Sequence, residues 1–531
     1  MAPQKTPASE VTADVYGVER LGIVRALPES SAGFGRPFGA VPVEGGVEFR
    51  VWAPNASHVA VRLGEDDRPL AQEGAGVFAA TFDAARGDDY RFALDGGDPL
   101  PDPCSRFQPH GVNGPSRVVE TPFDIPPGPK LQLEELAVYE LHVGTFTDEG
   151  TFDAAALHLA GLRELGVGAI ELMPVATFPG NRNWGYDGVY TYAPHPVYGG
   201  PEGLARLVGA AHEAGLGVIL DVVYNHIGPG SEKIAAFGPY FTDRYETFWG
   251  DAIDYSERGV REWAIQNAEL WVRDYRVDGL RLDAVHAIFD ERSPHVLAEL
   301  TARVRTVSPS ALVISEAAIG DDRPLEEWDH DLQWDDRLHH ALHALLTGER
   351  EGYYAEFGER ERIVEAFCSS VGRVVYAQNH DQVGNRARGD RLPPDLLRIA
   401  SSVVLLSPGI PLLFMGEEYG EPNPFQFFTD HDDPAIAEAT REGRKREFES
   451  FSGFAGEVPD PQAEETFLRS KLSRREVPGM RDHYRTLLNT RSRTDSVDRP
   501  GSSGLDGRPG TARASSESAS QASASVRRRG A

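Results

Sequence analysis

The sequence predicts an α/β protein in which a closed (β/α)8 TIM barrel follows a small all-β sandwich. Eight short apolar segments alternate with helical segments between residues 131 and 490, a rhythm typical of a parallel barrel. Before them, residues 34–100 contain short runs of alternating apolar and polar residues separated by turn residues, as expected for a sandwich. With 531 residues, the chain is long enough for both domains.

Composition narrows the class of protein and its partners. Hydrophobic residues make up 40% and charged residues 25% of the chain, as in ordinary globular proteins. The formal net charge of −29 argues against nucleic acid or an anionic membrane as a partner. Cys104 and Cys368 lack metal-ligand spacing, and two cysteines are no disulfide framework. The first thirty residues hold no apolar run of signal-peptide length, and no run is long enough to span a membrane, so we expect a cytoplasmic protein. Nothing in the sequence indicates an oligomeric state.

The N-terminal third divides into three segments. Residues 1–33 are polar and aperiodic, and we expect a flexible leader. The predicted sandwich resembles glucan-binding domains, and its strand signals lie at residues 47–54, 59–63, 78–82 and 90–94. An aromatic residue inside an alternating strand, such as Trp52, is expected in the core more often than on a sugar. A Pro/Gly-rich linker is predicted at residues 101–130.

The barrel is predicted from residue 131 to residue 490. Its strand signals lie at residues 137–146, 169–175, 217–224, 279–285, 311–316, 332–334, 373–379 and 411–415. Helical patterns are clearest at residues 154–165, 202–214 and 260–275. An irregular insert rich in glycine and aromatic residues, 227–255, separates the third and fourth strands, and such loops usually shape a binding cleft.

The C-terminal region changes composition abruptly. A charged amphipathic stretch from Pro459 to about Leu488 is suited to be the last barrel helix. Residues 491–531 consist mainly of serine, alanine, glycine and arginine, with few large apolar residues to bury, so we expect a disordered tail.

Functional residues of a TIM barrel lie where its strands end. Arg281 and Asp283 are two residues apart on the fourth strand, so their side chains share a face. A guanidinium beside a carboxyl group favours the ionised form, which keeps Asp283 available as a nucleophile at neutral pH. A purely structural pair closing the strand end is the alternative interpretation.

Other strand ends carry polar residues of the same kind. They supply Glu316, Asp381, His226 and His380, all predicted to face the cleft of Asp283. Two carboxyl groups on either side of a glycosidic bond are what glycoside hydrolysis requires, one as nucleophile and one as proton donor. The histidines are scattered and accompanied by arginine, which would repel a cation, so no metal and no other cofactor is expected.

Four segments resemble, in order, the motifs of the α-amylase superfamily of glycoside hydrolases: residues 221–226, 279–286, 314–316 and 379–381. The resemblance extends over roughly residues 40–490. It implies that Asp283 is the nucleophile, that Glu316 is the general acid/base and that Asp381 grips the distorted sugar. It further implies retention of anomeric configuration, a structural role for Asp221, and substrate contacts from Arg281, His286, His226, His380, Gln382 and Asn385.

Flanking segments are similar to one family within this superfamily, the malto-oligosyltrehalose trehalohydrolases. The similar segments are residues 101–109, 178–188, 346–354 and 379–391. The resemblance implies a role in trehalose biosynthesis: the α-1,4 bond beside the terminal trehalose of malto-oligosyltrehalose is cut, releasing trehalose and a maltodextrin. Branching enzymes share residues 184–188 and 414–418, so a 1,4-α-glucan branching enzyme is an alternative. The family's usual C-terminal β-sandwich has no counterpart after residue 490, which leaves a catalytically silent glucan-binding protein as a further alternative.

Four further residues are candidates for sugar contacts, each with a structural alternative. Trp184 and Tyr186 have aromatic faces that could stack on sugar rings or pack in the core. Asp336 and His339 follow the sixth strand and could line the trehalose side of the cleft or form polar cover on a helix.

Overall fold

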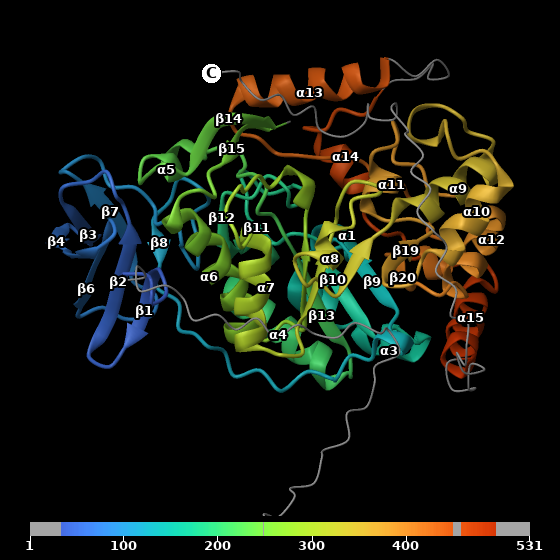
Figure 1. Ribbon diagram of the computed structural model, residues 1–531, viewed down its shortest axis with the longest axis horizontal. Coiled ribbons are helices and arrows are strands. Elements are labelled where there is room, and N and C mark those ends of the chain that lie inside the picture. The colour runs from blue at the N-terminus through green and yellow to red at the C-terminus, as the bar shows by residue number, and fades with distance from the viewer. Residues whose placement is uncertain (1–32, 248, 450–457, 495–531) are drawn as a thin grey trace, which may run out of the picture.

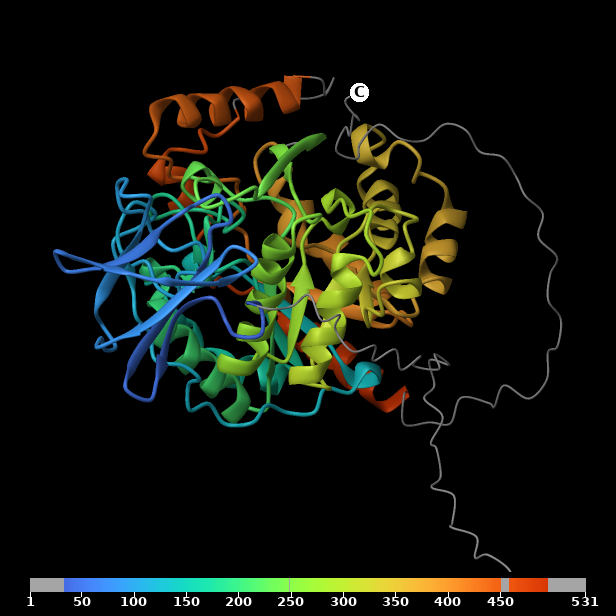
Figure 2. The same ribbon diagram turned by 60° about the vertical axis from the view of Figure 1, so that its left-hand side comes forward.

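A computed structural model describes residues 33–247, 249–449 and 458–494 (Figure 1). The barrel occupies the centre, the N-terminal sandwich lies against one side of it, and helix α13 (Pro434–Glu449) crosses one end (Figures 1 and 2). Most of the expected leader, residues 1–32, and of the expected tail, residues 495–531, lies outside the described residues.

The N-terminal domain consists of two antiparallel four-stranded sheets, which confirms the predicted sandwich. One sheet has the order β1 (Gly39–Val43), β2 (Gly46–Trp52), β6 (Val77–Phe82), β5 (Ala71–Gly74). The other has the order β4 (Asp66–Pro69), β3 (Val59–Leu63), β7 (Asp89–Leu94), β8 (Ser116–Arg117). Alternating residues of both sheets, among them Phe49, Val61 and Phe92, are fully buried in the core of the domain.

The second sheet continues past residue 100, where the sequence pattern suggested only a linker. Strand β8 pairs with β7 through Asp89 and Arg117, and the Arg117 guanidinium binds the Asp89 carboxylate at 2.6 Å. A two-residue strand is too short to show alternation, which is why the sequence did not indicate it.

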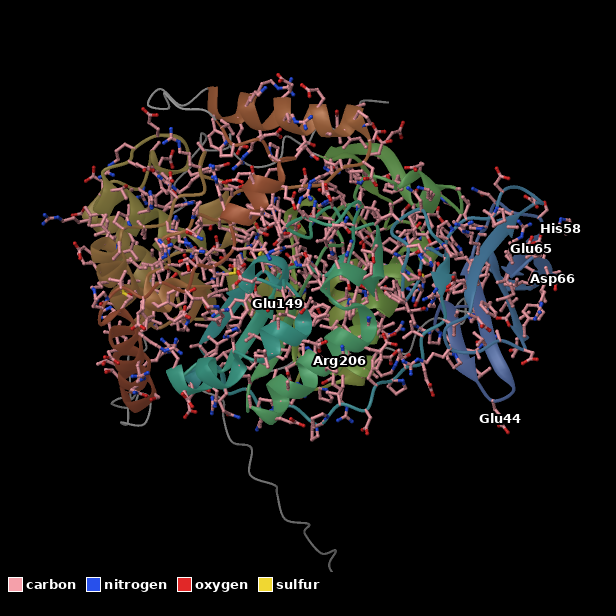
Figure 3. All side chains as sticks on the ribbon, turned by 180° about the vertical axis from the view of Figure 1, so that it is seen from behind. Glu44, His58, Glu65, Asp66, Glu149 and Arg206 are labelled. Atoms are coloured by element: carbon pink, nitrogen blue, oxygen red, sulfur yellow. The ribbon has the colours of Figure 1, made fainter. Side chains whose placement is uncertain are left out.

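The sandwich contacts the barrel through Trp52 on one side and carries charged residues on the other. Trp52 is buried, meets the ring of Tyr240 edge to face at 5.5 Å, and donates its indole N–H to the carbonyl of Ala75. Figure 3 shows His58, Glu65 and Asp66 on the side of the sandwich that points away from the barrel. The expectation that Trp52 lies in the core is therefore met.

Eight parallel strands close the predicted barrel. In their hydrogen-bonded order they are β9 (Val138–Leu141), β10 (Ala169–Leu172), β13 (Gly217–Val222), β16 (Gly279–Leu282), β17 (Leu312–Ser315), β18 (Leu332–Trp334), β19 (Arg373–Tyr376) and β20 (Ile410–Phe414), with β20 pairing back to β9. Every residue of these strands is buried, as in sheets covered on both faces. The TIM-barrel prediction is confirmed.

Helices follow most strands and form the outer layer of the barrel. The helices before the insert are α1 (Val143–Phe146), α2 (Phe152–Ala156), α3 (Leu159–Leu165) and α4 (Gly200–Glu213). Later ones are α6 (Arg258–Asp274), α7 (Val296–Val307), α8 (Arg323–Glu326), α9 (Asp336–Thr347), α10 (Arg360–Cys368), α11 (His380–Gly384), α12 (Pro394–Leu405), α14 (Glu464–Arg469) and α15 (Met480–Thr494). Short 3-10 turns are η1 (Leu133–Glu135), η2 (Pro196–Tyr198), η3 (Val285–Ala287), η4 (Gly352–Tyr354) and η5 (Glu417–Tyr419). The single helix expected at residues 154–165 is divided between α2 and α3.

The insert after β13 is more regular than the sequence indicated. It contains α5 (Glu232–Ala235) and an antiparallel hairpin of β14 (Phe241–Thr247) and β15 (Gly250–Ile253). A second two-stranded ribbon, β11 (Ala176–Thr177) with β12 (Tyr190–Pro194), precedes α4. Irregular register within both ribbons disrupts the two-residue alternation that would have revealed them.

The last helix extends beyond the residue at which the sequence suggested a disordered tail. Helix α15 runs to Thr494, and the side chain of Arg491 is buried against the end of α12. Its guanidinium donates to the carbonyl oxygens of Ser407 at 2.8 Å and Gly409 at 2.7 Å. Arg491 forms hydrogen bonds with main-chain carbonyl groups and adds no apolar residue to the sequence pattern. Composition alone therefore placed it in the predicted tail.

None of the helices in the described part of the chain combines the length and the apolar content needed to cross a lipid bilayer.

Substituting alanine at Gly259 tests the contact between the sandwich and the barrel. A Cβ atom at this α6 position would overlap the indole ring of Trp52, so we expect Gly259→Ala to lower the free energy of unfolding by about 1–3 kcal/mol. The matched control is Gly443→Ala in α13, where a Cβ atom meets nothing within 4 Å, and it should stabilise by about 0.5–1 kcal/mol. Urea titrations of the three proteins measure both effects. Equal stability of the two variants would contradict the contact.

Candidate active site

Arg281, the next-to-last residue of strand β16, is the centre of the polar cluster at the barrel mouth. Its side chain is fully buried, and its guanidinium carbon lies 4.2 Å from the centre of the Trp334 ring at the end of β18. Nη1 donates to Asp221 at 2.7 Å and to Asp283 at 2.9 Å, while Nη2 donates to Glu316 at 2.6 Å. One planar cation therefore fixes the positions of three carboxyl groups from three different strand ends.

Asp283 follows directly after β16 and is held at both ends of its carboxylate. Oδ1 accepts from Arg281, and Oδ2 accepts from the amide of Asn225 at 2.7 Å. The same amide also donates to the main-chain oxygen of Asp283 at 2.8 Å. The next residue, Ala284, adopts a left-handed backbone (φ 39°), which ends the strand at Leu282 and turns the chain over the cleft. These contacts orient the carboxylate as a nucleophile requires.

Glu316 follows β17 and lies beside Asp283. Its Oε2 accepts from Arg281 and from the backbone N–H of Ala284 at 3.2 Å. Burial raises the pKa of the Glu316 carboxyl above its usual value; Arg281 opposes this shift, and Asp283 adds to it. Because Asp283 and Glu316 bind the two ends of one guanidinium, they are close neighbours. A raised pKa suits Glu316 to donate a proton near neutral pH.

Asp381 lies on α11, across the cleft from Arg281. Its Oδ1 accepts from the amide of Asn385 at 2.9 Å, and its Oδ2 lies 3.4 Å from His380 Nε2. About a third of its side chain remains accessible. Burial raises the pKa of the Asp381 carboxyl, and the charge of His380 opposes that shift. An accessible carboxylate with an adjacent cation is suited to bind sugar hydroxyl groups.

Asp221 and Tyr186 connect the two sides of the cleft beneath the surface. The Tyr186 hydroxyl donates to Asp221 at 2.7 Å and lies 2.8 Å from His380 Nε2. The Tyr186 ring is stacked on the His380 ring at 5.2 Å. Burial raises the pKa of Asp221 to about 7, against the effect of Arg281. Asp221 thus lies behind the site, where the superfamily resemblance implied a structural carboxylate.

His226 and Trp249 form a flat surface at the insert side of the cleft. Their rings are stacked at 4.1 Å with an angle of 3° between them, and 44% of Trp249 is exposed. His226 also contacts the Asn225 side chain and the carbonyl of Tyr186. Burial lowers the pKa of His226 to about 4, so the imidazole is neutral at physiological pH. Trp249 was not among the sequence candidates, since its strand hairpin looked irregular.

Two of the predicted aromatic and histidine contacts lie in the interior instead. Trp184 is buried, stacked on Phe425 at 5.1 Å, with its edge toward His380, which favours the core-packing interpretation. His339 is also buried and contacts the carbonyl of Ala377 at 2.7 Å. With Gln382 it lines a separate cavity of about 380 Å³ between α9, α11 and the start of α12.

Two predicted contacts remain at the rim of the carboxyl cluster. Asp336, at the first turn of α9, accepts from Tyr376 and from Gln382, both at 2.7 Å. His286 lies in η3, close enough to Glu316 to lower the pKa of its carboxyl. The ends of β16, β17 and β19 therefore bring together Asp283, Glu316, Asp381, Arg281 and His380. The loop before β12 adds Tyr186, and Trp184 and His339 support the cluster from behind.

Among the described residues, no group of three or more histidine, cysteine, aspartate or glutamate side chains has the arrangement of a metal site. Arg281 pairs with Asp221, Asp283 and Glu316, and His380 lies 3.4 Å from Asp381.

Comparisons with known proteins agree with the two-domain architecture. The family model of the alpha amylase catalytic domain matches residues 142–249, and that of carbohydrate-binding module 48 (isoamylase N-terminal domain) matches residues 37–115. The malto-oligosyltrehalose trehalohydrolase of Saccharolobus solfataricus is 43% identical over 494 residues, covering 86% of each chain. The corresponding protein of Deinococcus radiodurans is 43% identical, covering 85% of this chain and 81% of its own.

Solved structures give the same result for the fold. A protein from Salmonella typhimurium, assigned as an alpha amylase, is 38% identical with a TM-score of 0.79, and 86% of each chain is covered. A pullulanase from Anoxybacillus sp. complexed with maltotetraose has a TM-score of 0.65 at 20% identity, over 86% of this chain and 74% of its own, a likeness of fold alone.

Removing the shared guanidinium tests whether the cluster depends on it. Arg281→Met leaves buried carboxyl groups without their counter-charge, so the free energy of unfolding at pH 7.5 should fall by about 3–5 kcal/mol. The loss should diminish toward pH 4, because the raised pKa values of Asp221 and Glu316 let these two carboxyl groups become neutral there. The control Arg323→Met removes a half-exposed pair with Asp321 and should change stability by at most about 1 kcal/mol. Equal losses in both variants, or a loss independent of pH, would contradict a central role for Arg281.

Proposed function

The chain belongs to the malto-oligosyltrehalose trehalohydrolases, glycosidases of the α-amylase family, and from this premise we propose that Asp283, Glu316 and Asp381 carry out its hydrolysis. The substrate is malto-oligosyltrehalose, and the products are trehalose and a shortened maltodextrin. The observation that carries the residue assignment is that Asp283 and Glu316 share the two ends of the Arg281 guanidinium. Two carboxyl groups separated by about 5–5.5 Å are typical of retaining glycosidases.

In the first step, a carboxylate oxygen of Asp283 forms a bond with the anomeric carbon of the glucosyl unit beside trehalose. The bond from that carbon to the trehalose oxygen breaks, and Glu316 gives its proton to this leaving oxygen. Free trehalose departs, and the maltodextrin remains as an ester of Asp283. The raised pKa of Glu316 supports its role as proton donor, and the two hydrogen bonds on Asp283 support its role as nucleophile.

In the second step, water attacks the same carbon. Glu316, now ionised, accepts a proton from the water, and the bond to Asp283 breaks with its electrons returning to the carboxylate. The enzyme recovers its starting protonation state, and the maltodextrin leaves with a new reducing end. No cofactor enters this sequence, because both proton transfers and both bond exchanges are completed by the two carboxyl groups and water.

The remaining residues of the cluster bind the glucosyl unit in this proposal. Asp381 accepts hydrogen bonds from its hydroxyl groups, with the His380 cation beside it and with Asn385 and Gln382 behind. Tyr186, His226 and His286 complete the walls, and the accessible face of Trp249 stacks on an adjoining sugar ring. Trp184 and His339 support this surface without contacting sugar, and Asp336 positions Gln382.

We also propose the domain roles and the setting of the reaction. The sandwich, residues 34–100 with the added strand β8, is a glucan-binding-like domain, and the segment to residue 130 leads to the barrel with its insert. The substrate is neutral, so the acidic surface does not repel it. A cytoplasmic location fits the two free thiols, since exposed Cys368 persists most easily in a reducing compartment.

An alternative function, which differs only in the molecule that accepts the glycosyl group, is supported by similarity to a branching enzyme. The 1,4-alpha-glucan branching enzyme of Corynebacterium jeikeium is 26% identical over 84% of this chain. The same carboxyl groups would form the glycosyl ester in a branching enzyme, and only the acceptor would differ. A silent glucan-binding protein is the other alternative, and it would bind the sugar without releasing product.

Product analysis separates these functions. Chromatography after incubation with malto-oligosyltrehalose should show free trehalose, and Asp283→Asn should reduce its release to the background of the assay while keeping the side-chain volume. Asp67→Asn, in an exposed pair on the sandwich, is the control and should leave the rate unchanged. New α-1,6 branches on amylose, or binding without any product, would overturn the hydrolase proposal.

A further inference from the structure

Glu140, on the first barrel strand, has a contact that the proposed reaction does not use. Its side chain is buried, and both of its carboxyl oxygens are engaged by one residue, His380. Oε2 accepts from the backbone N–H of His380 at 2.9 Å, and Oε1 lies 2.5 Å from Nδ1 of the imidazole. The residues are 240 positions apart in the chain, so the contact joins β9 to the start of α11. It holds both the backbone and the ring of the residue next to Asp381.

The hydrogen bonds around His380 determine where its protons lie. The Tyr186 hydroxyl has one hydrogen, which it donates to Asp221 Oδ2, an oxygen that also accepts from Arg281. The phenol oxygen must then accept from His380 Nε2, 2.8 Å away. On the other side of the ring, Nδ1 faces a carboxylate oxygen of Glu140, to which it donates. Both ring nitrogens therefore carry hydrogen, and His380 is an imidazolium.

We propose that Glu140 is a positioning residue of this active site, which keeps His380 in the cationic form with its Nε2 atom 3.4 Å from the carboxylate of Asp381. The inference rests on the proposed function, because it assigns the His380–Asp381 pair to sugar binding. Glu140 itself touches no reacting atom. It acts through His380, whose positive charge pairs with the Asp381 carboxylate that binds the sugar in the proposed function.

Several charged or titratable groups surround the imidazole. Glu140 and Asp381 favour the cation, whereas Arg281 opposes it. Four groups face it: His142 directly after β9, Glu171 on β10, Asp221 on β13 and Tyr186 in the loop before β12. The rings of Trp184 and Trp334 cover it. Burial lowers the pKa of His380, but Asp381 and Glu140 more than compensate, and the result is a pKa of about 10. The cation then persists throughout the physiological range.

Glu171 provides a matched control on the neighbouring strand. It pairs in register with Glu140 across β9 and β10, so the two side chains lie on the same face, and it is equally buried. Neither of its carboxyl oxygens has a hydrogen-bond partner within the described structure. Burial raises the pKa of Glu171 far above its usual value, which favours the neutral form of the carboxyl. Glu171→Gln therefore keeps the shape of the side chain and its favoured neutral form.

The first test measures binding of malto-oligosyltrehalose by titration calorimetry in a Glu316→Gln background, which removes the titrating general acid. With Glu140 present, the dissociation constant should be the same at pH 6 and pH 9, because His380 stays charged. With Glu140→Gln added, the pKa of His380 should fall by about 2–3, and binding should weaken at least about tenfold between those pH values. Glu140→Asp should restore the flat profile, and Glu171→Gln should leave it flat.

Two binding outcomes would overturn the proposal. Equal weakening by Glu140→Gln at both pH values would indicate a merely structural residue. A profile as flat as that of Glu171→Gln would show that His380 does not need Glu140 for its charge.

A second test does not depend on sugar binding, so it remains decisive if the chain releases no trehalose. His380 has a folded pKa raised above 6.5, so its charge stabilises the fold below that pH and the stabilisation is lost as the pH rises through about 10. The melting temperature of Glu140→Gln should therefore lie below that of the unaltered chain at pH 7, with the deficit narrowing toward pH 10.5. If the melting-temperature deficit of Glu140→Gln stays constant with pH, the inference is contradicted. Any deficit of the control Glu171→Gln is expected to be constant in this way.

Discussion

A single buried guanidinium determines where the acidic groups of this barrel can lie. Arg281 has no accessible surface, and it binds Asp221, Asp283 and Glu316 at hydrogen-bond distance. Three carboxyl groups could not remain close together in a buried site without such a cation, because each would repel the others and become protonated. The planar fork of arginine also fixes their directions, which a flexible lysine would not do. Geometry and charge at the site are thus consequences of one side chain at the end of β16.

The barrel makes this arrangement possible because its strands end together. Side chains from β13, β16, β17 and β19 reach the same cleft although they are far apart in the chain. A second cation, His380, lies on the opposite side and is connected to Arg281 through Tyr186 and Asp221. The side proposed to hold the nucleophile and the side proposed to bind the sugar are therefore parts of one buried hydrogen-bond network. Glu140 extends it into the first strand, at the bottom of the site.

The sequence indicated those parts of the structure that rest on repeated local patterns. All eight barrel strands and the sandwich were recognisable, because buried strands leave continuous or alternating apolar runs. The predicted strand from residue 279 to 285 nevertheless ends at Leu282, since Ala284 turns into a left-handed conformation that no apolar pattern reports. Contacts made by single polar residues were also invisible: Asn225 on Asp283, Glu140 on His380, and Arg491 at the end of α12. Trp184 has an aromatic face that could stack on a sugar ring, and only the packing of Phe425 on that face shows that it is interior.

In the proposed reaction, the Arg281 guanidinium holds Asp283 and Glu316 close enough for Asp283 to attack the sugar while Glu316 protonates the leaving oxygen. The most direct test is proton NMR of the reaction with malto-oligosyltrehalose in its first minutes, before mutarotation. A covalent ester on Asp283 requires two inversions at the anomeric carbon, so the new reducing end of the maltodextrin should appear as the α-anomer. Initial formation of the β-anomer would mean a single direct attack by water, and the central claim would be wrong.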